Sequence, residues 1–422
     1  MRRSQGRDNT PSIKPVQKIE LSEKGVKKRA ILAVALLAFG LVFLGVAIFN
    51  WLSYDEGWTR IEPTSESSES VSSDMILLYE LGVSDTSATA EYKALSVLYT
   101  ELCKKAYRIF HADYGFEDVH NPYYINRNIG QEIEVEPALY RAFEQIDRAQ
   151  NRFLFAAPFY TEYRNMFYDT EDFSAAQFDP YKSEDVANYF AELSAYTSSE
   201  EHVRLELLGN NKVKLYVSDE FQTFAQENAI DTFIDFFWAK NAFVVDYIAE
   251  SLVEEGYLYG SISAYDGFMR TFDPRKDSSY SYNLISRYDG KVYDSGKLEY
   301  KGENSIVSLR PFKTSDRDMI YYRYEDGTER HGYVDVKDGL CKNALDTLVS
   351  YSRDRSCGEV LLSVIPIYIA NDFDGEKLKD LVQKGIYSIY SDGTVLFYNE
   401  EAVALKDLFD DGKTKFIASL VK

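Results

Sequence analysis

The residues of this chain that could do metal chemistry are oxygen donors rather than nitrogen or sulfur donors. The 422 residues include 4 His and 3 Cys, and Cys103, Cys341 and Cys357 form no Cys-x-x-Cys pair. A zinc site needs several such ligands at short spacing, and a disulfide framework needs more cysteines. If the protein binds a metal, oxygen ligands must therefore hold it, which indicates magnesium or calcium.

One carboxylate and one hydroxyl have a spacing that suits such a site. Glu359 and Ser363 lie four residues apart, so on a helix they would project from the same face and could share one hard cation. The competing interpretation is that residues 359–370 form a buried strand. The segment is rich in β-branched residues, and Pro366 would disturb a helix running past it. The residues alone favour the strand.

The composition indicates a globular body that does not bind nucleic acid. With 47 Lys+Arg against 68 Asp+Glu, the formal charge is −21, which repels phosphate backbones. The 34 Tyr and 26 Phe argue against wholesale disorder, because such side chains bury large areas when a chain folds.

Residues 30–52 are uncharged and long enough to cross a membrane as a helix. The preceding residues 1–29 contain nine Lys/Arg, and Asp55 and Glu56 follow the apolar run. The positive-inside rule therefore predicts a cytoplasmic tail and a single-pass cell-membrane anchor, with an extracytoplasmic main domain. A cleaved signal peptide is the alternative, but its apolar region would be shorter and followed by a small-x-small site.

The exported part divides into a tether and a folded domain. Residues 53–73 are rich in Ser and Glu and read as a flexible linker, so the domain spans 74–422. Apolar spacing and turn residues predict the following elements: a strand at 75–82, helices at 92–111, from 136 and at 240–255, and hairpins turning at 209–211, 326–327 and 392–393. This order of helices and hairpins indicates an α+β fold with mostly antiparallel sheets.

Several segments, taken in order over about residues 75–400, resemble the FAD:protein FMN transferases, also called ApbE-type flavin transferases. The family's Met-Gly-Thr strand corresponds to Met75-Ile76-Leu77, and its Gly-Ala-Phe-Asp to Ala157-Pro158-Phe159-Tyr160. Its loop and helix entry match Ile125-Asn126-Arg127-Asn128-Ile129-Gly130 and Val135-Glu136-Pro137.

The family's central motif, Asp-Leu-Gly-Gly-Ile-Ala-Lys-Gly-Tyr-Ala-Val-Asp, is similar to residues 234–246, which keep Ala239-Lys240 and Asp246. Its Gly-Gly-Asp turn is reduced to Tyr265-Asp266-Gly267. Its His-Ile-Ile-Asp-Pro-x-Thr-Gly segment becomes residues 332–339, with His331 one place early. The family's metal-binding Ala-Asp-Ala-Leu-Ala-Thr-Ala resembles residues 358–364.

The resemblance implies an ApbE-like, T-fold-like domain and a complete set of site residues. Magnesium would be held by Glu359 and Ser363. Asp335 would be the catalytic acid or base. The residues implied to bind FAD, the substrate, are Met75, Tyr114, Phe159, Asp235 and Lys240.

Some of these residues have simpler interpretations. Lys240 could be a solvated residue at a helix start, and Met75 and Tyr114 could belong to the core or a loop. Phe236 and Phe237 stand where the family has two glycines, so they either fill the ligand space or rebuild it as an aromatic wall. Asp246 could be a helix-face or capping charge.

The resemblance implies transfer of FMN from FAD to a Thr of an exported redox protein. The chain lacks the Ser/Thr-Gly-Ala/Ser-Thr acceptor signature, so it is not expected to modify itself. One alternative is a catalytically inactive module that binds flavin or an envelope protein. Another is a tethered surface protein without a ligand.

Overall fold

The structure is a computed structural model that describes residues 25–421 except 66, 68, 70–74, 85, 316 and 402. For residues 46–52 the backbone alone is described. The chain forms two units, 1–54 and 55–422, which we describe separately. Most of the predicted cytoplasmic tail 1–29, and part of the predicted linker, lie outside the described residues.

The first unit contains helix α1 (Val26–Leu52). Its 27 residues give a length of about 40 Å at a rise of about 1.5 Å per residue. By length and composition, Val26–Gly45 is enough to cross a membrane. The predicted span 30–52 lies within α1, while the direction in which it crosses remains a prediction.

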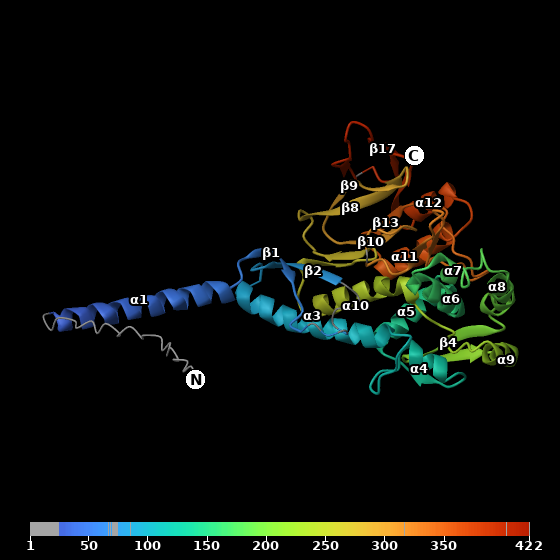
Figure 1. The fold of residues 1–422 in the computed structure, drawn as a ribbon, viewed down its shortest axis with the longest axis horizontal. Helices are drawn as coiled ribbons and strands as arrows, with labels where there is room; N and C mark the ends of the chain where they lie inside the picture. The colour runs from blue at the N-terminus through green and yellow to red at the C-terminus, as the bar shows by residue number, and fades with distance from the viewer. Residues whose placement is uncertain are drawn as a thin grey trace, which may run out of the picture. The chain divides into compact units, whose positions relative to one another are not determined.

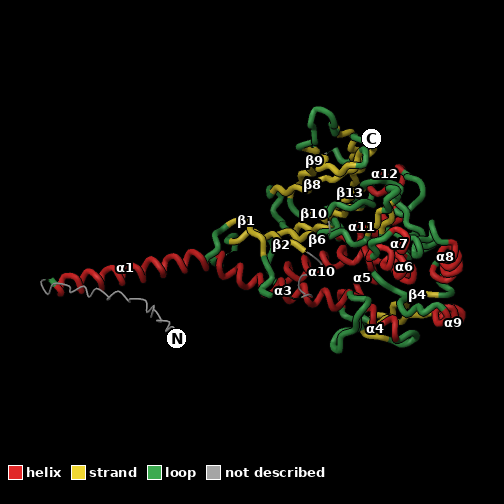
Figure 2. Tube along the Cα trace, in the orientation of Figure 1, coloured by secondary structure: helices red, strands yellow, loops and turns green. Residues whose placement is uncertain are grey.

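The second unit is built on a nine-stranded sheet (Figures 1 and 2). In spatial order its strands are β1 (Gly57–Ile61), β2 (Met75–Leu81), β6 (Gly260–Ala264), β7 (Phe268–Phe272), β10 (Asn304–Leu309), β13 (Leu348–Ser352), β14 (Tyr387–Asp392), β15 (Val395–Tyr398) and β17 (Ile417–Leu420). Neighbouring strands are antiparallel except β15 and β17, which are parallel. The predicted α+β class with mostly antiparallel sheets is confirmed.

Helices cover one face of this sheet. Helix α10 (Lys240–Glu254) packs on β6 and β7, and α3 (Ala88–Phe110) and α11 (Cys357–Tyr368) pack against α10 (Figure 1). The remaining helices of this unit are α4 (Pro122–Arg127), α5 (Pro137–Arg148), α6 (Ala157–Tyr168), α7 (Asp172–Ala175), α8 (Glu184–Thr197), α9 (Asp219–Glu227) and α12 (Gly375–Val382), with the short 3-10 helices η1 (Phe153–Ala156) and η2 (Phe237–Ala239). Two small sheets pair β3 (Ile133–Glu134), β5 (Lys212–Val217) and β4 (Val203–Gly209), and β11 (Tyr321–Arg323) with β12 (Glu329–His331).

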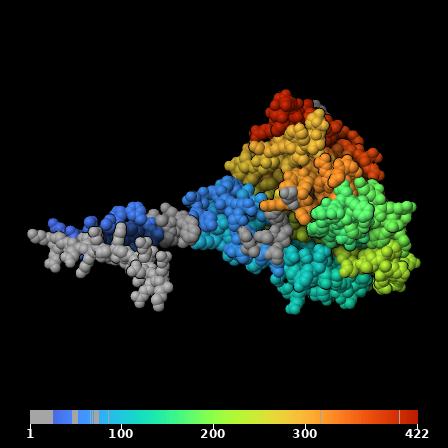
Figure 3. Space-filling view, viewed as in Figure 1, coloured from blue at the N-terminus to red at the C-terminus, as the bar shows by residue number. Residues whose placement is uncertain are grey.

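A second layer of strands covers the other face. Strands β8 (Ser279–Tyr288), β9 (Lys291–Lys301) and β16 (Leu405–Lys406) enclose a separate apolar cluster with β10, β13, β14 and β15. Because both faces of the sheet are covered, every residue of β10 is buried. Figure 3 shows the β8–β9 hairpin and the C-terminal residues, drawn in yellow and red, side by side on the surface.

Most predicted elements are confirmed. Helix α10 ends just before Gly256, whose φ of 89° fits the left-handed position after a helix end. Helix α5 starts at Pro137 and buries the predicted apolar face. The three predicted hairpins are β4–β5, β11–β12 and β14–β15.

Two segments differ from what the residues alone favour. Residues 359–368 belong to helix α11 rather than to a strand, because Ser356 and Glu359 form a reciprocal capping box at its start. The predicted linker 53–73 is not a tether throughout, because β1 lies within it and pairs with β2. The strand forms there because Ile61 is buried in the main core, at 1% exposure.

Candidate functional site

The candidate site is a cavity of about 370 Å³ between the start of α10, the β6–β7 turn and the chain that follows β10. Its lining residues are Tyr168, Phe237, Trp238, Lys240, Asn241, Tyr265, Asp266, Arg310, Pro311, Phe312, Arg317, Asp318, Met319, Ile320, Tyr321, His331 and Tyr333. Its volume lies within the range of small-molecule sites, near the lower end.

The β6–β7 turn places Asp266 against the start of α10. Gly267 has a φ of 108°, and a Cβ atom there would lie 2.4 Å from the Ser308 carbonyl oxygen, so glycine lets β10 approach the turn. Asn241 Nδ2 donates a hydrogen bond to Asp266 Oδ2 at 2.9 Å. Burial raises the pKa of the Asp266 carboxyl to about 7, although Asn241 and Arg310 favour its charged form.

Four buried polar atoms of the lining residues have no hydrogen-bond partner among the described residues. They are Trp238 Nε1, Asn241 Oδ1, Asp266 Oδ1 and Arg310 Nε. Two of these atoms are donors and two are acceptors. Buried polar atoms are almost always hydrogen-bonded in native proteins, whether to protein groups, ordered water or a ligand. These four atoms therefore mark the place at the cavity where a polar group would be bound.

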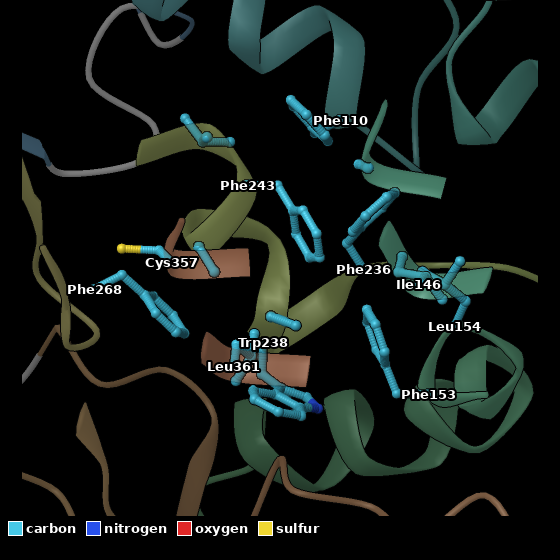
Figure 4. Packing of buried hydrophobic residues seen from close by; sticks show 14 of the residues in the cluster. Phe110, Ile146, Phe153, Leu154, Phe236, Trp238, Phe243, Phe268, Cys357 and Leu361 are labelled. Atoms are coloured by element: carbon cyan, nitrogen blue, oxygen red, sulfur yellow. The ribbon is translucent and has the colours of Figure 1, made fainter. Parts of the chain in front are cut away.

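The adjacent phenylalanines Phe236 and Phe237 have different roles. Phe236 is fully buried and packs against Phe110, Phe143 and Phe243 at centroid distances of 5.2–5.7 Å. Figure 4 shows its ring between those of Phe110 and Phe243 and the neighbouring Phe153. Phe237 instead lines the cavity, with a φ of 41°. The first ring therefore fills space and the second forms an aromatic wall.

Neighbouring residues fix the position of Phe237. Its ring lies 4.4 Å from the ring of Tyr160, and the Arg164 guanidinium lies 4.9 Å from its centroid. Its backbone N–H donates to Asp235 Oδ1 at 2.9 Å. These contacts hold a residue with a side chain in the left-handed region, at an intrinsic cost of about 1–2 kcal/mol.

The cavity has more positive than negative charge available to a ligand. Lys240 forms no ion pair with the part of the chain that the structure describes. Arg310 faces Asp318 at 3.5 Å, and both side chains are largely buried. Since the Asp266 pKa is raised to about 7, this carboxyl is only partly charged at neutral pH. Lys240 could therefore pair with an anionic group of a ligand.

His331 lines the same cavity as a neutral residue. Burial lowers its pKa to about 4. One ring nitrogen, Nε2, lies 3.0 Å from Asn343 Oδ1, and the Tyr333 backbone N–H donates to the other, Nδ1, at 3.3 Å. These contacts orient the imidazole.

Of the ligand-binding residues predicted from the sequence, Lys240 lines the cavity. Asp235 lies next to the cavity wall: its carboxylate accepts a hydrogen bond from the Phe237 backbone N–H and forms an ion pair with Arg164. Met75 pairs with Ala264 across β2 and β6, one residue before the turn that places Tyr265 in the cavity. Neither Asp235 nor Met75 belongs to the lining.

The other predicted residues lie outside the lining. Phe159 is fully buried, with its ring 4.9 Å from that of Phe190. Tyr114 is exposed and packs against Phe116. Asp335 accepts a hydrogen bond from Lys342 Nζ at 2.8 Å, within its own loop.

The predicted magnesium ligands lie on the outer face of α11. Glu359 uses its carboxylate to accept the Ser356 backbone N–H at 3.1 Å, and the Ser363 hydroxyl donates to the Glu359 carbonyl oxygen at 2.8 Å. On the inner face, Leu361 lies in the same buried cluster as Trp238 (Figure 4). Among the described residues, no three His, Cys, Asp or Glu side chains gather as metal ligands. Glu359 and Ser363 do not fit a magnesium site against the cavity.

Asp246 anchors α11 instead. Its two carboxylate oxygens accept the backbone N–H groups of Cys357 and Gly358 at 2.9 and 2.8 Å. Arg270 donates to the same carboxylate at 3.1 Å. Burial raises the pKa of Asp246 to about 6. This is the capping role that the sequence left open.

The sequence pattern does not indicate most of the residues that line the cavity. Asp266 was visible as the reduced Gly-Gly-Asp turn, and Asn241 as a replaced glycine, but nothing in their spacing showed that they meet. Arg310 and Tyr333 come from irregular segments after β10 and β12, which carry no periodic signal. The capping-box spacing Ser-x-x-Glu at 356–359 was readable and assigns Glu359 to the helix start.

Solved structures with a similar fold are ApbE proteins. The ApbE protein of Thermotoga maritima matches with a TM-score of 0.53 and 11% identity, over 84% of this chain and 97% of the other. The flavin transferase ApbE of Vibrio cholerae matches with a TM-score of 0.52 and 9% identity, over 84% of this chain and 98% of the other. No family model and no curated protein matches the sequence. The likeness is therefore one of fold, and the chain has an ApbE-like fold.

Proposed function

We propose that this protein is a membrane-anchored flavin-binding module with an ApbE-like fold, and that its domain lies outside the cytoplasm. The observation that carries the proposal is the group of four unpartnered polar atoms beside an aromatic wall in one cavity. A flavin ring combines a large aromatic face with carbonyl and imide groups along one edge. Such a ligand would use both features of the cavity.

The first unit supports the proposed location. Helix α1 is long and apolar enough to span a membrane, and basic residues precede it in the sequence. This supports a cytoplasmic N-terminus and an exported domain.

Transfer of FMN from FAD to a Thr of an exported protein is the second candidate. The specific observation in its favour is the fold likeness to a structure described as a flavin transferase. The cavity contains Lys240, which could contact a phosphate, and the oriented His331. We derive no step through magnesium, because the Glu359 carboxylate and Ser363 hydroxyl bind groups of their own helix.

Binding and transfer can be separated in one experiment. Full-length protein in lipid nanodiscs is titrated with riboflavin, FMN and FAD by calorimetry. It is then incubated with FAD, magnesium and a peptide carrying the Ser/Thr-Gly-Ala/Ser-Thr signature. We expect saturable binding and no covalent flavin on the peptide. Covalent labelling would establish the second candidate, and the absence of any heat of binding for any flavin would overturn both.

A variant at Asp266 and a matched control variant test whether flavin binds in this cavity. Asp266→Asn changes a carboxylate that lines the cavity, whereas Asp277→Asn changes an exposed one. We expect weaker flavin binding from the first variant and unchanged binding from the second. Equal effects would indicate that flavin binds elsewhere.

A further inference from the structure

Resting on the proposed function, we infer that the cavity holds one flavin ring with a single phosphate, as in FMN, and binds it without a divalent cation. This narrows the ligand from a dinucleotide to a mononucleotide. It also assigns charge neutralisation to the chain's own lysine and arginine side chains.

The volume of the cavity favours the smaller ligand. At about 370 Å³ it lies near the lower end of the roughly 300–1,000 Å³ typical of drug-sized ligands. FAD consists of an FMN half and an AMP half, so it needs room for two ring systems. The cavity suits one ring system and its side chain.

The unpartnered atoms match a flavin edge. Trp238 Nε1 and Arg310 Nε are donors, and each could bind one of the two carbonyl oxygens of the pyrimidine ring. The imide N–H between these carbonyls is a donor, which an oxygen of Asp266 or Asn241 could accept. Adenine has no carbonyl oxygen, so it offers these donors a poorer match.

The charges suit one phosphate. Arg310 is already beside Asp318 at 3.5 Å, whereas Lys240 has no ion-pair partner among the described residues. Lys240 is close enough to Asp266 and His111 to affect the pKa of both. A phosphate monoester would give this ammonium group its partner.

Among the described residues that line the cavity, the oxygen donors do not form a cation site. Of its carboxylates, Asp318 accepts from the Thr314 hydroxyl and the Ser315 backbone N–H, and Asp266 is bound to Asn241. Hard divalent cations need several free oxygen ligands. The two oxygen donors expected from the sequence, Glu359 and Ser363, are not in the lining.

A larger hollow elsewhere does not compete for this ligand. It has a volume of about 710 Å³ and is lined mainly by charged residues between β9 and the segments around 273–279, 353–354 and 403–406. None of the unpartnered buried side-chain atoms found among the described residues belongs to its lining. It offers a planar polar ring no specific partner.

The test compares riboflavin, FMN, FAD and ADP by calorimetry on the full-length protein in nanodiscs, with EDTA or with magnesium. We expect FMN to bind about tenfold more tightly than riboflavin, because its phosphate gains a charged hydrogen bond. EDTA should change neither value by more than about twofold, and ADP should bind at least about a hundredfold more weakly than FMN.

Two variants test separately the contacts to the flavin ring and the contact to the phosphate. Lys240→Met should remove the advantage of FMN over riboflavin, while Lys93→Met, at an exposed position of α3, should leave it intact. Trp238→Phe should weaken FMN and riboflavin by the same factor, because it removes a donor to the ring.

Three results would overturn the inference while leaving flavin binding in place. These are FAD binding without riboflavin or FMN binding, loss of binding in EDTA, and ADP binding as tight as that of FMN. Failure of all three flavins would instead overturn the proposed function itself.

Discussion

Asn241 and Asp266 are joined by a hydrogen bond of 2.9 Å between the start of α10 and the β6–β7 turn. The bond uses the amide nitrogen of one residue and one carboxylate oxygen of the other, and it leaves an unpartnered oxygen on each. It therefore fixes both side chains at the cavity while leaving them able to accept from a ligand.

The first prediction concerns pH. The pKa of Asp266 is about 7 in the folded protein and about 3.8 in the unfolded chain. Between these values the folded state holds a proton that the unfolded state releases, so the contribution of Asp266 to stability falls as pH rises from about 4 to 7. The slope is at most about 1.4 kcal/mol per pH unit.

Asp266→Asn removes this contribution. The Tm of the variant minus that of the wild type should therefore increase from pH 4 to pH 7 and then level off. Subtracting the wild type cancels the raised pKa of Asp246 and the lowered pKa of His331, which both proteins share. A difference in Tm that stays flat over this pH range would contradict the pKa assigned to Asp266.

The second prediction concerns the paired phenylalanines. Phe236→Gly should lower the free energy of unfolding by about 3–5 kcal/mol or more, because the ring is fully buried among other aromatic rings. Phe237→Gly should cost clearly less, because glycine relieves the left-handed backbone by about 1–2 kcal/mol. Thermal unfolding of both variants compares them directly.

For flavin affinity, we expect the change at Phe237 to matter more than a change at Phe236. Loss of the Phe237 ring removes the aromatic wall, so flavin affinity should fall more than in a mild core variant such as Phe236→Leu. Equal losses of affinity would argue against an aromatic wall at residue 237.

The third prediction concerns the anchor of α11. Asp246→Ala should destabilise the fold by about 3–5 kcal/mol, because it leaves two backbone N–H groups and the partly buried Arg270 without their carboxylate. Glu250→Ala removes a more exposed partner of the same arginine and should cost about 1 kcal/mol or less. Similar losses of Tm in the two variants would contradict an anchoring role for Asp246.

The fourth prediction concerns the capping box. Ser356→Ala should cost about 1 kcal/mol, because it removes the side-chain acceptor for the Glu359 backbone N–H. Ser363→Ala should change stability by about 0.5 kcal/mol or less, since its hydroxyl bonds back to a carbonyl already inside the helix. Neither change should alter flavin affinity. A magnesium-dependent loss of affinity in Ser363→Ala would restore the metal site predicted from the sequence.

The fifth prediction concerns topology. In intact cells, a membrane-impermeant maleimide should label Ser198→Cys in the exported domain and leave Ser4→Cys in the tail unlabelled. Ser198 is exposed. Of the native cysteines, Cys103 and Cys357 are buried and Cys341 is half-buried, so labelling of the parent chain measures the background. Labelling of Ser4→Cys alone would reverse the proposed orientation.

The sequence predicted those elements whose positions depend on local pattern. Helix α10 follows from its apolar spacing and from Gly256 at its end, and the hairpins follow from their turn residues. Together with the resemblance, these elements were sufficient to predict the fold class.

The lining of the cavity depends instead on contacts between distant segments. Asn241 and Asp266 are 25 residues apart, and Arg310 reaches them only because β10 pairs with β7. For Glu359 the limit is different: four-residue spacing shows that two side chains share a helix face but not which face turns inward, so its role in metal binding remains a prediction. For Asp246, periodicity could not distinguish a buried charge from a solvated one.

The position of Trp238 has a practical consequence. The chain contains three tryptophans, and of these Trp238 alone lines the candidate site, while Trp51 lies in α1 and Trp58 in β1. With Trp51 and Trp58 changed to Phe, the protein would carry a single indole fluorophore within contact distance of any occupant. Energy transfer from that indole to a yellow, light-absorbing ligand would report occupancy optically, without a dye and without isolating the complex.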